Sequence, residues 1–119
     1  MLKVLLVDDE YEMVTTLAER LHLRAIDADF VFSGKDAVTL IMEEMYDVVV
    51  LDMKMPGMSG LETMEQIQEI RPETKIIFLT GHGSVADCEA SKKHGACSYL
   101  LKPVDIEVLI EKMCEALTG

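Results

Sequence analysis

Polar residues that could do chemistry together directly follow four short apolar segments of this chain. They are Asp8 and Asp9 after residues 3–7, Asp52 after residues 48–51, Thr80 after residues 75–79, and Lys102 after residues 97–101. Carboxylates are the ligands that hard divalent cations prefer, and an aspartate carboxylate can itself accept a phosphoryl group. No His or Glu directly follows these segments as a strong general base, so the pattern favours a phosphorylatable aspartate over a hydrolytic site.

Three carboxylates in one site would repel one another. Two unit charges ~4 Å apart interact by roughly 4 kcal/mol at an effective dielectric constant near 20. Mg²⁺ held by Asp9 and Asp52 would remove this cost and leave coordination positions for a phosphoryl oxygen. Lys102 would then supply a positive charge to the phosphoryl group, and Thr80 a hydroxyl donor.

Each of these residues also has a simpler structural explanation. Asp8, Asp9 or Asp52 could cap a helix, Thr80 could bond to its own backbone, and Lys102 could be a solvated surface residue. If each residue had its own structural role, its position at the end of an apolar segment would be a coincidence in every case. A single site explains all of them together.

Strand and helix patterns alternate along the whole chain, which predicts an α/β fold. The apolar segments 3–7, 27–32, 48–51, 75–79 and 97–101 predict strands, and apolar stripes over 10–23, 37–45, 61–70, 84–94 and 106–117 predict helices. Such alternation implies a parallel sheet with helices on both faces, whose ligand sites lie at the carboxyl ends of the strands. We expect the three most apolar strands at the centre and residues 27–32 at an edge.

Size and composition predict one domain over residues 1–119, and the net charge of −11 disfavours binding to nucleic acids. A divalent cation or a basic protein surface is a more natural partner. Cys88, Cys97 and Cys114 form no CxxC pair, so we expect reduced thiols, buried or half-buried, in a cytoplasmic protein. No signal peptide or membrane-spanning segment is apparent.

Three other phosphate- or metal-binding folds fit the sequence less well. A haloacid-dehalogenase-like phosphatase needs a second Asp two residues after the first, where this chain has Lys54. A Toprim-like nuclease needs a Glu after the first strand and a later DxD motif, and the acidic charge is unfavourable for it. A flavodoxin needs a Ser/Thr/Gly phosphate loop where this chain has three acids, Asp8-Asp9-Glu10.

The chain resembles a two-component response-regulator receiver domain, of the chemotaxis-receiver type, over essentially all its residues. The matching features are Asp8-Asp9, Asp52 with the segment DMKMPGMSG, Thr80-Gly81, and Lys102-Pro103. The resemblance implies a flavodoxin-like fold with sheet order 2-1-3-4-5 and no activity as a separate enzyme beyond assisting its own phosphorylation and dephosphorylation. It also implies specific roles: Asp52 as phosphoacceptor, Mg²⁺ held by Asp9, Asp52, Asp8 (partly through water) and the Lys54 carbonyl, phosphoryl contacts from Thr80 and Lys102, and a cis peptide before Pro103.

The resemblance further implies a switch. Tyr99 would turn from an exposed to a buried position as the Thr80 loop moves, while Lys54 and His82 would tune dephosphorylation. The output face would comprise helix 84–94, strand 97–101 and the last helix, which is also a candidate homodimer surface. Partners would be a sensor histidine kinase or phosphotransfer protein, and an output domain or target protein.

The segment LTGHGS resembles receivers of σ54-dependent transcription activators, although a stand-alone messenger is equally compatible. A degenerate receiver that acts only as an interaction module is the alternative. The intact set Asp9, Asp52, Thr80 and Lys102 argues against it.

Overall fold

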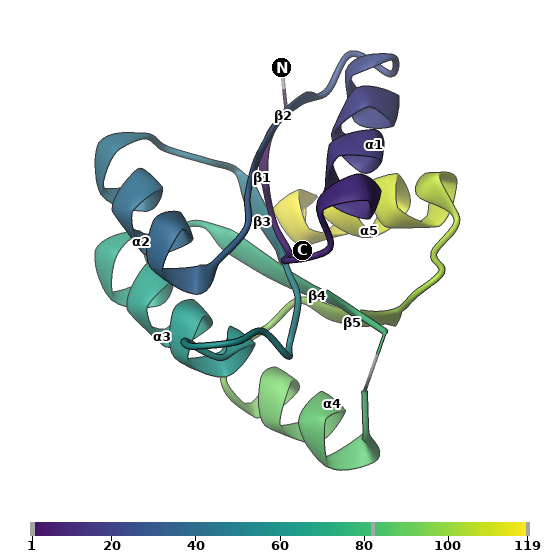
Figure 1. Ribbon diagram of the computed structural model, residues 1–119. Coiled ribbons are helices and arrows are strands. Elements are labelled where there is room, and N and C mark those ends of the chain that lie inside the picture. Colours follow the sequence, from purple (N-terminus) through teal and green to yellow (C-terminus); the bar gives the residue numbers. More distant parts are fainter. Residues whose placement is uncertain (1, 82, 119) are drawn as a thin grey trace.

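The computed structural model describes residues 2–81 and 83–118, in which strands and helices alternate along the chain (Figure 1). The strands are β1 (Lys3–Val7), β2 (Asp27–Val31), β3 (Val48–Leu51), β4 (Lys75–Thr80) and β5 (Ser98–Leu101). The helices are α1 (Tyr11–His22), α2 (Gly34–Glu43), α3 (Gly60–Ile70), α4 (Val85–Lys93) and α5 (Ile106–Thr118). All strand pairs are parallel, in the order β2-β1-β3-β4-β5. The predicted fold, sheet order and edge position of β2 are thus confirmed.

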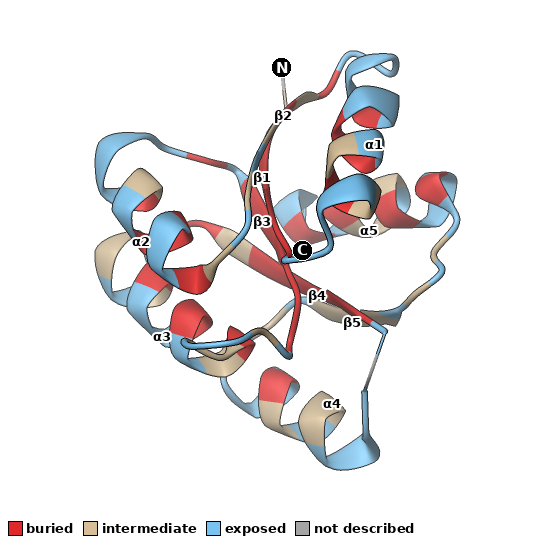
Figure 2. Cartoon of the chain, in the orientation of Figure 1, coloured by how far each residue is buried: buried red, intermediate tan, exposed pale blue. Residues whose placement is uncertain are grey.

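Alternate residues of the central strands pack against different helices, because successive side chains of a strand point to opposite faces. Val4 and Leu6 belong to a core shared with α1 and α5. Leu5 and Val7 belong to a second core shared with α2 and α3. Figure 2 shows the central strands buried, with exposed residues on the outer sides of the helices. Burying each such side chain stabilises the fold by about 1.5–3 kcal/mol, which fixes the sheet that carries the polar residues.

Serine side chains start three of the helices. Ser33, Ser59 and Ser84 are the N-cap residues of α2, α3 and α4, and each accepts a hydrogen bond from the third residue of its helix. At α3 the cap is reciprocal, since Glu62 also accepts a hydrogen bond from the Ser59 amide. This capping box fixes where α3 begins after the loop that follows Asp52.

Helix α4 buries few of its residues against the rest of the domain. Of its described residues, Ser91 alone is buried. Val85, in its first turn, is largely exposed. A helix with so few buried apolar contacts can be displaced at low free-energy cost.

Some details of the sequence prediction are wrong. Phe32 lies beyond the end of β2, and β5 begins at Ser98, one residue later than predicted. Cys88 is half-buried, but Cys97 and Cys114 are exposed. Cys97 precedes the edge strand β5, and Cys114 lies on the outer side of α5, so neither enters a core. No helix within the described ranges is long and apolar enough to cross a membrane.

Candidate functional site

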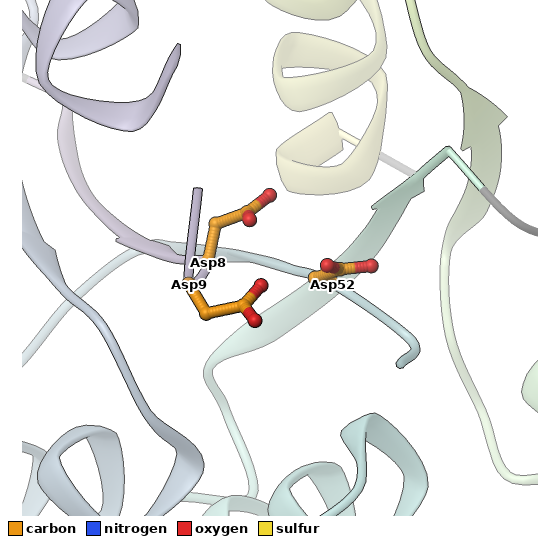
Figure 3. Close-up of side chains that lie close together, drawn as sticks. All are labelled: Asp8, Asp9 and Asp52. Atoms are coloured by element: carbon orange, nitrogen blue, oxygen red, sulfur yellow. The ribbon is translucent and has the colours of Figure 1, made fainter. Parts of the chain in front are cut away.

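Three carboxylates meet at the carboxyl ends of the neighbouring strands β1 and β3 (Figure 3). Asp8, Asp9 and Asp52 each offer an oxygen, and these oxygens lie within 4.8 Å of one another. Asp8 and Asp52 are only 4% and 6% exposed, whereas Asp9 is exposed. The strand ladder explains the proximity, because the Asp52 amide donates to the Val7 carbonyl at 3.0 Å. The chemistry of these donors suits a hard divalent cation.

Lys102 approaches the carboxylates from the end of β5. Its Nζ atom lies 2.7 Å from Asp8 Oδ2 and 3.0 Å from Glu10 Oε1, but 3.9 Å from Asp52 Oδ2. Its amide donates to the Thr80 carbonyl at 2.9 Å, and its peptide bond to Pro103 is cis. The ammonium group therefore lies on the Asp8 side of the site, close to Asp52 without a hydrogen bond to it.

The pKa values of this pair are shifted by opposing effects. Burial raises the pKa of Asp8, and the hydrogen bonds from Lys102 and the Glu10 amide only partly oppose it. Burial alone would lower the pKa of Lys102, but its hydrogen bonds to Asp8 and Glu10 outweigh this effect and the pKa is raised. Lys102 is thus charged at neutral pH, while burial and the nearby Asp52 charge disfavour the Asp8 carboxylate.

Thr80 is the last residue of β4 and is fully buried. Strand β4 pairs with β3 in a register that places Leu51 beside Phe78. Thr80 therefore lies one position further along the sheet than the neighbour of Asp52. The fold brings Thr80 to the same end of the sheet as the carboxylates and Lys102.

Comparison with known proteins decides the family. Residues 4–114 match the response regulator receiver domain family. The chain belongs to this family. Receiver domains are signalling domains of two-component systems rather than separate enzymes.

Relatives and solved structures give the same result. The transcriptional regulatory protein GlrR of Escherichia coli (strain K12) is 33% identical over 114 residues, which are 96% of this chain and 26% of that protein. The chain thus spans about a quarter of that relative's length. A CheY-like receiver domain from Methanospirillum hungatei JF-1 superposes with a TM-score of 0.94 at 28% identity, covering 99% of this chain and 94% of the other.

A further solved structure bears on the chemistry of this receiver family. It is a response regulator protein from Burkholderia pseudomallei with a phosphorylated aspartic acid, calcium ion and citrate. It superposes with a TM-score of 0.90 at 26% identity, covering 95% of this chain and 66% of that chain. A receiver of this fold thus carries a phosphoaspartate, and the acidic cluster here is consistent with a divalent metal ion at such a site.

Two hydrogen bonds from backbone amides hold the loop after Asp52 in this receiver domain. The Lys54 amide donates to Asp52 Oδ1 at 3.4 Å, and the Gly60 amide donates to the Met53 carbonyl at 2.9 Å. The Lys54 ammonium group lies 3.7 Å from Asp87 Oδ2, so the loop is linked to α4. The role of the Lys54 carbonyl as a metal ligand stays a prediction.

The burial of Tyr99 is intermediate between the exposed and the buried positions predicted for it. Its side chain is half-buried, and its ring lies 6.2 Å from that of Phe78. Its hydroxyl is fully buried and has no hydrogen-bond partner among the described residues. Burial, with the nearby charge of Asp87, raises the pKa of Tyr99. His82, predicted to tune dephosphorylation, lies outside the described residues.

The sequence prediction missed two residues near the site. Glu10 binds Lys102, and Asp87 binds Lys54. The first had a visible signal, since Glu10 is the third acid of the Asp8-Asp9-Glu10 run. The second had none, because Lys54 and Asp87 are joined only by tertiary packing.

Proposed function

We propose that this receiver domain is activated by phosphorylation of Asp52, with Mg²⁺ as cofactor and a sensor histidine kinase or phosphotransfer protein as donor. The observation that supports it is the convergence of the Asp8, Asp9 and Asp52 carboxylates beside Lys102. Two of these carboxylates are almost fully buried, where uncompensated negative charge is costly. A divalent cation is the simplest compensation.

Asp8, Asp9, Asp52 and the Lys54 carbonyl are the groups proposed to hold Mg²⁺. When bound, the ion would neutralise the carboxylates and orient the phosphoryl oxygens. A carboxylate oxygen of Asp52 attacks phosphorus as the bond to the donor imidazole nitrogen breaks, and the electron pair leaves with that nitrogen. Lys102 and Thr80 stabilise the phosphoryl oxygens, which is most of what phosphoryl transfer requires.

The output of the proposed switch is a change on the face formed by α4, β5 and α5. A phosphoryl group on Asp52 adds charge that Thr80 and Lys102 can bind. The weakly packed helix α4 and the half-buried Tyr99 are the groups best placed to respond. A downstream output domain, a target protein or a second copy of the domain would bind this face. The relation to a transcriptional regulator makes a transcription-factor output domain our preferred partner.

Acetyl phosphate or beryllofluoride with Mg²⁺ tests the proposal on the isolated domain. Mass spectrometry should detect one added phosphoryl group in the wild type. The adduct should be absent after Asp52→Asn or after chelation of Mg²⁺. An adduct that persists in Asp52→Asn would refute Asp52 as acceptor. Absence of any adduct in the wild type would favour the degenerate interaction module.

A further inference from the structure

Glu10 occupies an unusual place beside the phosphorylation site. It is the N-cap residue of α1 but its side chain makes no capping hydrogen bond. Instead its carboxylate reaches Lys102 Nζ at 3.0 Å, while its amide donates to Asp8 Oδ1 at 2.9 Å. The Glu10 side chain is 57% exposed, whereas that of Lys102 is 12% exposed. An exposed carboxylate therefore holds a largely buried ammonium group.

The distances around Lys102 show which carboxylates compete for its ammonium group. Asp8 and Glu10 lie within hydrogen-bonding distance of Nζ, at 2.7 and 3.0 Å. Asp52, at 3.9 Å, lies beyond it. Nζ has three N–H donors, so each hydrogen bond kept by Glu10 is one fewer for a phosphoryl oxygen on Asp52.

Glu10 differs from Asp8 because Asp8 has a second role beside its ion pair with Lys102. Asp8 belongs to the carboxylate cluster suited to a cation, and Glu10 is outside that cluster. A cation bound by Asp8 would weaken the attraction between Asp8 and Lys102. Glu10 would then be the remaining anionic competitor for the ammonium group.

We propose that Glu10 is a positioning residue that holds Lys102 in the unphosphorylated domain and releases it when Asp52 carries a phosphoryl group. The inference rests on the proposed role of Asp52. Little free energy is needed for release, because an ion pair with one exposed partner contributes little to stability. Glu10 thus lowers the affinity of the site for a phosphoryl group without contacting that group.

The test compares Glu10→Gln with Glu12→Gln at saturating Mg²⁺. Glu12 is exposed in the first turn of α1, and within the described residues it forms no ion pair with Lys102, so this control removes the same charge but not the contact. Beryllofluoride binding is measured by calorimetry, because the chain has no Trp to report it. We expect Glu10→Gln to bind about 2- to 5-fold more tightly than wild type, and Glu12→Gln to bind like wild type.

Two further measurements separate positioning from a structural effect. With acetyl phosphate, Glu10→Gln should lower the half-saturating concentration while the maximal phosphorylation rate stays close to wild type. In metal-free protein, NMR should detect faster proton exchange at the Lys102 ammonium group in Glu10→Gln but not in Glu12→Gln. Glu10→Ala should behave like Glu10→Gln, because neither change removes a helix cap.

The outcomes distinguish this inference from the proposed function. Equal beryllofluoride affinities of Glu10→Gln and Glu12→Gln would overturn the positioning role, since charge alone would then explain any change. Affinities of Glu10→Gln equal to or weaker than wild type would also overturn it. Failure of the wild type itself to bind beryllofluoride would instead refute the phosphoacceptor role of Asp52.

Discussion

Gly60 supports the loop that carries Asp52, and replacing it with alanine should destabilise the domain. It is the first residue of α3, and its amide bonds the Met53 carbonyl. A Cβ atom at Gly60 would overlap the Asp52 carbonyl oxygen. It would also lie 2.7 Å from Met53 Cα and 2.9 Å from the Met53 carbonyl oxygen. These are backbone atoms, which cannot rotate away as the end of a side chain can.

Two effects of opposite sign determine the size of the change. Alanine is favoured over glycine inside a helix by roughly 0.5–1 kcal/mol. Overpacking a dense region costs typically about 1–3 kcal/mol. Since the overlap is with backbone, we expect the second effect to win, with a net loss of up to about 2.5 kcal/mol in the free energy of unfolding. At about 4 °C per kcal/mol for a domain of this size, Tm should fall by up to about 10 °C.

Urea unfolding followed by circular dichroism measures this change, with Gly57 as the comparison site. Gly57 has a φ of +79°, and no described atom lies within 4 Å of a Cβ built there. Gly57→Ala should therefore lose stability through backbone strain alone, and Gly57→Asn should recover part of it, because Asn tolerates this conformation. At Gly60 we expect the opposite order of stability, with Gly60→Asn less stable than Gly60→Ala.

Gly60→Ala should also slow phosphorylation by acetyl phosphate, because the displaced carbonyl belongs to the acceptor residue. A Gly60→Ala variant as stable as the wild type, or more stable, would refute the steric reasoning. It would mean that helix propensity dominates and that the loop yields easily.

Two further predictions concern tyrosines. The Tyr46 hydroxyl donates to Asp29 at 2.6 Å, so Tyr46→Phe should cost about 1 kcal/mol of unfolding free energy at pH 7. Burial and this carboxylate raise the pKa of Tyr46 far above its unfolded value of 10.0. The stabilisation by the Tyr46 hydroxyl is thus complete below pH 10 and is lost as pH rises above 10. If urea titrations showed the wild type to keep its full stability difference over Tyr46→Phe above pH 10, they would contradict this. A Cβ at Gly83 would overlap the Tyr99 hydroxyl, so Gly83→Ala should turn that ring outward. The Tyr99 pKa, followed by NMR, should fall towards its usual value, and an unchanged pKa would show that the loop moves instead.

The sequence by itself determined the fold and the end of the sheet at which Asp8, Asp52 and Lys102 lie. The alternation of buried strands with amphipathic helices specifies a parallel sheet, because only that arrangement buries both kinds of apolar pattern. Parallel strands end on the same side, so residues after them must meet. The sequence alone therefore predicts that Asp8, Asp52 and Lys102, far apart along the chain, lie at one place.

Only the tertiary structure decided how these groups are paired. The end of β5 fixes the position of the Lys102 backbone. The direction of its long side chain depends on the carboxylates that it contacts, which are those of Asp8 and Glu10. The link between Lys54 and Asp87 joins the loop after β3 to the first turn of α4, and no local pattern encodes the distance between these two segments. The exposure of Cys97 likewise follows from its position beside an edge strand. Local periodicity fixes which face of an element is buried, whereas side-chain partners depend on packing between elements.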